Sequence, residues 1–329
     1  MSEKPKVAVV IPAYKVRAHV LGVIADIGPE VDRIYVVDDA CPEGSGDYVR
    51  ANCTDLRVSV LRHGENRGVG GAVMSGYRAA IDDGYDVIVK VDGDGQMLPS
   101  LIPQFIAPIL AGEADYTKGN RFFDLEALRA MPKVRLFGNA ALSFLTKLSS
   151  GYWDVFDPTN GYTAIHRDVA RHLPFHKISN RYFFETDLLF RLNTLRAAVV
   201  DIPMAARYEE EVSNLKISKV LFEFAGKHIR NFAKRIFYNY YLRDMSLASI
   251  ELPIGCLSLA VGAYLGASRW LAALHSGIPT PTGTVVLSAL GVILGVQFLL
   301  AFLAYDIASV PRRAMHPTLA VSKGLSVCQ

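Results

Sequence analysis

The chain has 329 residues, of which 51% are hydrophobic and 20% are charged, and its formal net charge is +3. This length suffices for one large domain with an addition, or for two domains. The mild positive charge does not indicate a nucleic-acid partner, and we expect none. The 4 cysteines form no CxxC pair, which argues against a zinc site and favours reduced thiols.

The first 210 residues alternate between short apolar runs and segments with helical spacing of apolar residues. Such alternation predicts β-α-β units, and therefore an α/β sheet of mainly parallel strands with helices on both faces. The predicted strands cover residues 6–14, 31–40, 58–63 and 85–94. The predicted helices between them include residues 17–27 and 70–84.

Polar and glycine-rich residues follow each of the predicted strands. Ligands of parallel sheets bind beyond the carboxyl ends of the strands, so we expect these segments to converge on one edge. The segments are Pro12–Lys15, Asp38–Asp39, His63–Gly71 and Asp92–Gln96.

Two aspartates, Asp92 and Asp94, leave the end of the last of these strands in the sequence VDGDGQM. Carboxylates this close repel each other unless a positive charge lies nearby. An EF-hand is excluded, because Met97 and Pro103 stand where such a loop needs glycine and glutamate. An aspartyl phosphohydrolase and a solvated turn without metal remain as alternatives. We favour a site for Mg²⁺ or Mn²⁺ on a substrate diphosphate, with Asp92, Asp94 and Gln96 as ligands.

Asp38 and Asp39 end the second predicted strand. Carboxylates there can accept hydrogen bonds from ribose hydroxyls or from base N–H groups, but such pairs also cap turns. The stretch ENRGVGGAVMSG, residues 65–76, opens the next helix and matches neither the dinucleotide fingerprint nor a Walker loop. Its small residues let a ligand come close, and close packing of the helix explains them equally well.

Two charge-poor segments lie near the C-terminus, at residues 252–268 and 276–305. Roughly 20 apolar residues suffice to cross a bilayer, and Arg269 can snorkel to the interface. The link LHSGIPTPTG, residues 274–283, holds no lysine or arginine, whereas basic residues precede the first segment and follow the second. The positive-inside rule therefore places both flanks in the cytoplasm. Two buried helices of a soluble protein are the alternative.

Residues 217–245 alternate basic residues with aromatic and aliphatic ones at helical spacing. This pattern predicts amphipathic helices that lie on an anionic membrane face, with an ordinary packing helix as the alternative. The N-terminal apolar run is short and stops at Pro12, so we expect that it is not a signal peptide. We therefore expect an integral membrane protein with two spans and with the catalytic domain and both termini in the cytoplasm. The expected domains are a catalytic domain at 1–210, an acceptor loop with juxtamembrane helices at 211–247, a transmembrane hairpin at 248–307 and a tail at 308–329.

Several pieces of the sequence, taken together in their order and spacing, resemble glycosyltransferase family 2. Within that family they are most similar to the polyprenyl-phosphate glycosyltransferases, which include the dolichyl-phosphate mannosyltransferases. The pieces are VVIPAYK, VVDDAC, ENRGVGGAVMSG, VDGDGQM, GNRF, DPTNGYTAIHR, FFETDLLFRL and DIPMAARYEEEVSNLKI. The resemblance implies the GT-A fold of nucleotide-diphospho-sugar transferases, a Rossmann-like mixed sheet with helices on both faces, here followed by the amphipathic and membrane-spanning helices.

The resemblance also implies roles for individual residues. Those that would bind the donor are Pro12, Ala13, Tyr14, Asp38, Asp39, Asn66, Gly70, Asp92 and Gly93, and the metal ligands would again be Asp92, Asp94 and Gln96. The catalytic residues would be Asp187 and Arg121, and the residues that bind acceptor or phosphate would be Arg121, Asn160, Arg207 and Lys216. Lys15, Val69 and the EEE run at 209–211 depart from the family pattern, which leaves donor identity and loop motion open.

The expected reaction is an inverting transfer of one sugar from a nucleotide diphosphate sugar to undecaprenyl or dolichyl phosphate. A uridine donor is preferred over GDP-mannose, and the lipid-linked product would serve cell-envelope glycan or glycoconjugate synthesis. The acceptor phosphate, with a second pKa near ~6, needs little help from a base, so Asp187 would orient groups rather than remove a proton. With a sugar hydroxyl as acceptor, Asp187 would instead act as a base.

Two other functions remain open. The first is polysaccharide synthesis on a sugar hydroxyl. Such enzymes usually carry a QxxRW-type motif, and the only Arg-Trp pair of this sequence, Arg269–Trp270, lies inside a predicted span, which argues against this function. The second is a non-catalytic scaffold that binds nucleotide sugar. Membrane lipids and a second copy of the chain are further expected partners.

Overall fold

The computed structural model describes residues 4–123, 133–204 and 217–319. Contacts divide the chain into two compact units. The larger unit joins residues 1–232 with residues 311–329, and the smaller unit covers residues 233–310. Arg207 and Lys216, for which phosphate contacts were predicted, lie outside the described residues.

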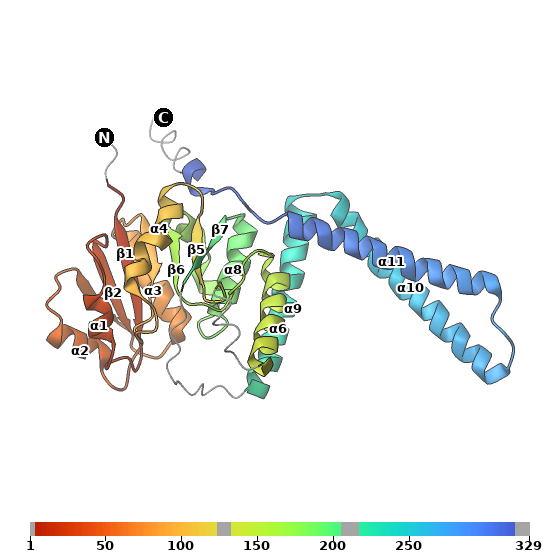
Figure 1. The fold of residues 1–329 in the computed structure, drawn as a ribbon, viewed down its shortest axis with the longest axis horizontal. Coiled ribbons are helices and arrows are strands. Elements are labelled where there is room, and N and C mark those ends of the chain that lie inside the picture. Colours follow the sequence, from red (N-terminus) through yellow and green to blue (C-terminus); the bar gives the residue numbers. More distant parts are fainter. Residues whose placement is uncertain (1–3, 124–132, 205–216, 320–329) are drawn as a thin grey trace. The chain divides into compact units, whose positions relative to one another are not determined.

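The described strands of the larger unit form one sheet. They are β1 (Val7–Ala13), β2 (Arg33–Asp38), β3 (Val58–Arg62), β4 (Val87–Lys90), β5 (Tyr116–Asn120), β6 (Thr163–His166) and β7 (Val199–Pro203). The 7 strands lie in the order β3-β2-β1-β4-β6-β5-β7 (Figure 1). Strand β6 is antiparallel to β4 and β5, and the other neighbouring strands are parallel. The predicted mixed α/β sheet is thus confirmed.

Helices cover both faces of this sheet. Those described in the larger unit include α1 (Val20–Ala25), α2 (Ser45–Asn52), α3 (Gly68–Asp82), α4 (Ile102–Leu110), α6 (Lys133–Ser150), α7 (Arg167–Arg171) and α8 (Phe184–Leu195), and α9 (Ile217–Phe237) leads into the smaller unit. Val9 of β1 joins a core with Val23 of α1 and Phe105 of α4. On the opposite face, a Cβ on Gly76 of α3 would lie 2.3 Å from Val10 Cγ1, so glycine lets α3 pack closely on β1. A strand buried on both faces reads as a continuous apolar run, as β1 does.

The register of the parallel strands defines the ligand edge. Ala13 of β1 pairs with Asp38 of β2, and Asp38 pairs with Arg62 of β3. The segments that follow β1, β2, β3 and β4 therefore leave the sheet from the same edge, as the sequence predicted.

The last described residues pack at the other end of the sheet. Asp115, which precedes β5, is fully buried and accepts hydrogen bonds from the backbone N–H groups of Met315, at 2.9 Å, and His316, at 2.9 Å. The His316 imidazole also contacts Asp115, with Nδ1 2.8 Å from Oδ1, and it stacks on His166 with ring centroids 4.1 Å apart. The segment after residue 310 is therefore an integral part of the larger unit.

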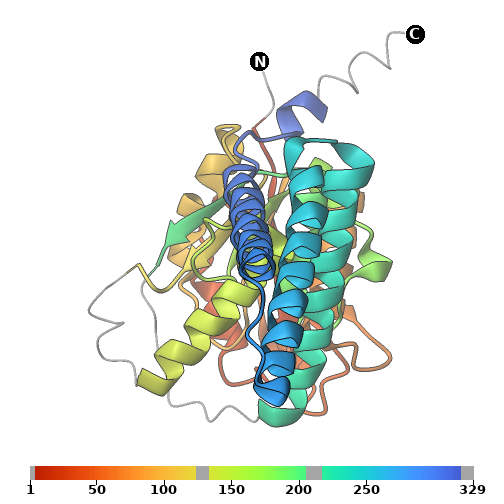
Figure 2. The ribbon, with the colours of Figure 1, turned by 90° about the vertical axis from the view of Figure 1, so that its right-hand side faces the viewer.

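The smaller unit is built around two long apolar helices, α10 (Leu247–Ser276) and α11 (Thr282–Ala308), which lie side by side in both views (Figure 1, Figure 2). A Cβ on Gly262 would lie 2.7 Å from the Val292 nitrogen, so small residues allow the backbones to approach, as in membrane helix pairs. Both helices are long and apolar enough to cross a membrane, with mean hydropathies of 1.5 and 2.5. Only 11% of the most apolar window of each is buried, unlike the core helix of a soluble protein. These are two candidate membrane helices at the predicted positions.

A buried ion pair joins the end of α9 to the end of α11. Arg235 Nη1 and Nη2 contact the Asp306 carboxylate at 2.6 and 2.9 Å, and the Tyr240 hydroxyl donates to Asp306 Oδ1 at 2.5 Å. Tyr240 belongs to a short π-helix, Tyr238–Arg243, between α9 and α10. Arg235 and Asp306 are each 1% exposed, so this charge-assisted network holds both ends of the hairpin together.

Candidate active site

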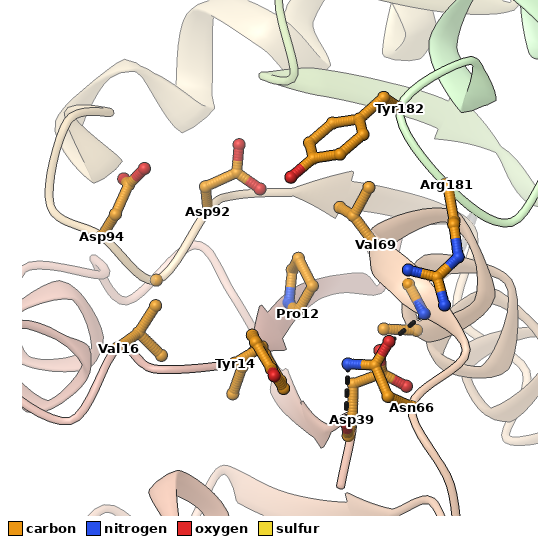
Figure 3. Close-up of a pocket in the computed structure, with 14 residues that line it drawn as sticks. Pro12, Tyr14, Val16, Asp39, Asn66, Val69, Asp92, Asp94, Arg181 and Tyr182 are labelled. Carbon is orange, nitrogen blue, oxygen red and sulfur yellow. Dashed lines mark hydrogen bonds between the residues drawn. The ribbon is translucent and has the colours of Figure 1, made fainter. Parts of the chain in front are cut away.

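A pocket of about 260 Å³ opens at the carboxyl edge of the sheet (Figure 3). Its walls come from the segments after β1, β2 and β4, from the start of α3 and from the loop before α8. The lining residues are Pro12, Ala13, Tyr14, Val16, Asp39, Asn66, Gly68, Val69, Ala72, Asp92, Gly93, Asp94, Arg181 and Tyr182. The structure thus brings most of the predicted donor-binding residues and two predicted metal ligands into one cavity.

Asp39 fixes the start of α3 beside this pocket. Its carboxylate accepts the backbone N–H groups of Arg67, at 2.8 Å, and of Gly68, at 2.7 Å. A helix N-terminus leaves such N–H groups without intrahelical acceptors, so a carboxylate from another segment stabilises it. Gly68 has φ +82°, and a Cβ there would lie 2.6 Å from the carbonyl oxygen of Asn180. Glycine is therefore required where α3 meets the loop before α8.

A lysine of the same strand supplies positive charge to Asp92. Lys90, the last residue of β4, is 1% exposed, and its Nζ lies 2.8 Å from Oδ1 and 3.0 Å from Oδ2 of Asp92. The same Nζ lies 3.8 Å from Oε1 of Glu185 on α8. Burial alone would lower the pKa of Lys90, but the negative charges of Asp92 and Glu185 outweigh burial and raise it. Lys90 is therefore a charged ammonium beneath the pocket.

Asp94 lies on the same loop as Asp92 and also lines the pocket. Its Oδ1 accepts the backbone N–H of Gln96 at 3.0 Å, while the Gln96 side chain is not part of the pocket wall. The Tyr182 hydroxyl points toward the Asp92 carboxylate from the opposite wall (Figure 3). Over the described ranges, no three His, Cys, Asp or Glu side chains gather as a ready-made metal site. A cation here would need further oxygen ligands from a substrate.

Asp38 and Gly70 lie outside the pocket lining. The Asp38 carboxylate accepts the backbone N–H groups of Cys41, at 2.8 Å, and Gly46, at 2.7 Å, and so holds the turn after β2. A Cβ on Gly70 would lie 2.5 Å from the Ser179 carbonyl oxygen. Close packing, one of the two accounts left open for the glycine-rich stretch, is thus present in α3. Direct donor contacts by Asp38 and Gly70 stay predictions.

Arg121 and Asp157 join two of the sequence pieces, GNRF and DPTN. Arg121 donates to the fully buried Asp157 through Nε, at 2.7 Å, and Nη2, at 3.2 Å, and 33% of the Arg121 side chain is exposed. Asn160 is buried outside the pocket lining, and its carbonyl oxygen accepts a hydrogen bond from the Lys118 ammonium. Burial lowers the pKa of Lys118 to about 8. Phosphate binding by Arg121 and Asn160 stays a prediction.

Asp187 is buried behind the pocket wall rather than exposed in it. Its Oδ2 accepts the backbone N–H of Ser179 at 2.9 Å, and its Oδ1 accepts an amide hydrogen of Asn231 on α9 at 3.0 Å. Glu185, also on α8, is instead the acidic residue that approaches the Lys90 ammonium. Asp187 therefore anchors the loop that carries two lining residues, Arg181 and Tyr182.

Sequence reasoning missed several residues of this region: Lys90, Glu185, Arg181 and Tyr182. Lys90 had a visible signal, because a charged residue in an otherwise apolar buried strand requires a partner. Glu185 belongs to the FFETDLLFRL piece, in which Asp187 was preferred. Arg181 and Tyr182 stand in a loop without a recognisable pattern.

A mixed sheet with a carboxylate-bearing pocket at its carboxyl edge is the arrangement expected of a GT-A glycosyltransferase. The Glycosyl transferase family 2 model matches residues 8–173. The chain belongs to glycosyltransferase family 2.

Named relatives agree with this assignment, and a solved structure shares the fold. The chain is 31% identical over 218 residues to the undecaprenyl-phosphate mannosyltransferase of Micrococcus luteus. The aligned region covers 65% of this chain and 88% of that protein. It is 27% identical over 215 residues to the UDP-N-acetylglucosamine–dolichyl-phosphate N-acetylglucosaminyltransferase of Methanococcus voltae, covering 61% of this chain and 85% of that protein. The UDP complex of glucosyl-3-phosphoglycerate synthase from Mycobacterium tuberculosis has a TM-score of 0.53 at 20% identity, covering 70% of this chain and 80% of that chain. This last similarity concerns the fold alone.

Proposed function

We propose that the protein transfers a single sugar, with inversion, from a nucleotide diphosphate sugar to a polyprenyl phosphate at the cytoplasmic membrane face. The observation that carries this proposal is the pocket with Asp92 and Asp94, in a chain that also has two exposed apolar helices. Two relatives act on undecaprenyl or dolichyl phosphate by name, which supports a lipid phosphate acceptor. The product would be a lipid-linked sugar for glycan or glycoconjugate synthesis.

The donor is proposed to be a UDP-sugar. One relative is a mannosyltransferase and the other is named for UDP-N-acetylglucosamine, so the comparisons leave both the sugar and the nucleotide open. Asp39 and Asn66 line the pocket near the start of α3, where they are suited to hold the base and ribose.

The pocket residues fit a divalent cation, Mg²⁺ or Mn²⁺. Asp92 and Asp94 both line the cavity, and each carboxylate oxygen has two lone pairs. Asp92 can therefore accept hydrogen bonds from Lys90 and still act as a ligand. Substrate phosphates and water would complete the coordination shell, as is usual for Mg²⁺. When bound, the cation would neutralise charge on the leaving diphosphate.

Helix α9 is suited to lie on the membrane surface. It buries the polar side chains of His228 and Asn231, whereas Ile229 is 68% exposed and Phe237 is 57% exposed. Arg230 and Lys234 are also exposed, so apolar and basic groups lie together on the outward side, as in interfacial helices. We propose that this helix brings the catalytic unit to the lipid acceptor, with two spans and both termini in the cytoplasm.

The function is tested by incubating membranes that contain the protein with labelled UDP-glucose, UDP-N-acetylglucosamine or GDP-mannose, each with polyprenyl phosphate. A lipid-extractable product that disappears with a chelator is expected. A product found on a sugar acceptor would indicate polysaccharide synthesis instead. Nucleotide-sugar binding without any turnover would indicate a scaffold.

Asp187→Asn should retain most of the transfer activity, whereas Asp187→Ala should lower thermal stability. The Asn231 amide oxygen has no hydrogen-bond partner among the described residues, so its amide can turn and accept from the new asparagine. Alanine would instead leave two buried donors unsatisfied, at a cost of roughly 1–3 kcal/mol each. Transfer rates, donor affinity and melting temperature are measured for both variants. Complete loss of transfer in Asp187→Asn, with intact donor affinity, would show that Asp187 takes part in the chemistry.

A further inference from the structure

We propose that Lys90 is a positioning residue of the transfer reaction, whose buried ammonium clamps Asp92 and Glu185 and offsets the negative charge that a donor diphosphate meets. The inference rests on the proposed binding of a nucleotide diphosphate in this pocket. Lys90 would not bind the cation. It would hold Asp92 and Glu185 in place and balance their charge.

The geometry around Lys90 is that of a built ion-pair site. The ammonium contacts both oxygens of Asp92, at 2.8 and 3.0 Å, and approaches Glu185 at 3.8 Å. Lys90 is 1% exposed, so its interactions with the two carboxylates are screened little by solvent. Asp92 is in the loop after β4, and Glu185 is on α8. The Lys90 side chain therefore links the floor of the pocket to α8, the helix that follows the loop of Arg181 and Tyr182.

A third segment makes room for this clamp. A Cβ on Gly161 would lie 2.4 Å from Lys90 Nζ and 2.7 Å from Asp92 Oδ2. Any larger residue at position 161 would therefore displace the ammonium, the carboxylate or both from their present positions. The chain therefore shapes three separate segments around a single buried positive charge.

The clamp has an electrostatic consequence that a purely structural residue lacks. With Lys90 in place, the charge of Asp92 is balanced before any ligand arrives. Without it, the pocket gains one net negative charge, which attracts a divalent cation more strongly and repels a diphosphate more strongly. Loss of Lys90 should therefore shift cation affinity and nucleotide affinity in opposite directions.

The test compares Lys90→Met with Lys90→Arg in the full chain, solubilised in detergent. Titrations measure the binding of Mn²⁺ alone and of UDP alone, and assays measure kcat and KM. We expect Lys90→Met to bind Mn²⁺ about tenfold more tightly and UDP about tenfold more weakly, with a reduced kcat. Lys90→Arg, which keeps the charge, should restore much of both affinities.

Arg167→Met is the control, because it also removes the cation of an ion pair in the larger unit, but at the opposite end of β4. Arg167 Nη2 lies 2.9 Å from Oδ1 of Asp86, which directly precedes β4, so its loss should lower the melting temperature without opposite tenfold shifts in affinity. If Lys90→Met does not fold, Gly161→Ala serves as the second variant, since it keeps both charges and displaces the pair. It should shift the two affinities in the same two directions.

The proposal is overturned if Lys90→Met, or Gly161→Ala in its place, weakens both ligands together or changes neither. It is also overturned if Lys90→Arg behaves like Lys90→Met. Failure of the proposed function has a separate signature, which is wild-type protein that binds Mn²⁺ and UDP but transfers no sugar to polyprenyl phosphate. The two binding shifts would then still decide the role of Lys90.

Discussion

Asp92→Asn is expected to lower kcat for sugar transfer by roughly 10²-fold or more, the scale on which a well-placed charge stabilises a transition state. The substitution removes a carboxylate from the pocket and also takes the main counter-charge from Lys90. The buried ammonium would then keep Glu185, at 3.8 Å, as its remaining ion-pair partner among the described residues, with the charge of Asp94 farther away. Steady-state transfer to polyprenyl phosphate, with saturating donor and Mn²⁺ or Mg²⁺, measures the effect.

Asp82→Asn is the control for this experiment, since it makes the same chemical change on an exposed part of α3. It should leave kcat within about twofold of the unchanged protein, as surface substitutions usually do. If Asp92→Asn kept full activity with bound donor, the carboxylate would have no part in transfer, and the proposed cation site would have to be abandoned.

Asp306→Ala is expected to destabilise the protein by about 3–5 kcal/mol, the typical effect of removing one partner of a buried ion pair. The change would remove the carboxylate that the buried Arg235 guanidinium and the Tyr240 hydroxyl both contact. The melting temperature of the detergent-solubilised protein should fall accordingly. Extraction from membranes without aggregation provides a second readout.

The double variant Arg235→Met with Asp306→Leu sharpens that test. Replacing both members of a buried pair by apolar residues is often neutral or stabilising, so the double variant should recover most of the lost stability. A double variant as unstable as Asp306→Ala would mean that the shape of the network, rather than its unpaired charge, sets the stability.

Much of the fold was predictable because its cause is local. Continuous apolar runs predict the buried parallel strands, and two charge-poor segments predict the candidate membrane helices. The direction of β6 was not predictable, because hydrophobic periodicity carries no information about strand orientation. The docking of His316 on Asp115 was also hidden, since it joins residues 201 positions apart without a local signal.

The candidate site was predictable as a set of segments, but less so residue by residue. Successive strand residues point to opposite sides, so the sequence did not show that Asp39 would reach the pocket while Asp38 holds a turn. Residues two positions apart in a helix differ by about 200° around its axis. Glu185 and Asp187 of α8 therefore also point to opposite sides. Tertiary packing decides which member of each pair meets the ligand.

The docked tail determines how this enzyme can be shortened. The apolar hairpin is an insertion within the catalytic unit, because residues on both sides of it belong to that unit. A chain that stops at residue 232 would discard the N–H groups of Met315 and His316 along with the hairpin, and it would expose the buried carboxylate of Asp115 to water. A water-soluble catalytic unit is therefore better sought by excising the hairpin and bridging the gap than by truncating the chain before it.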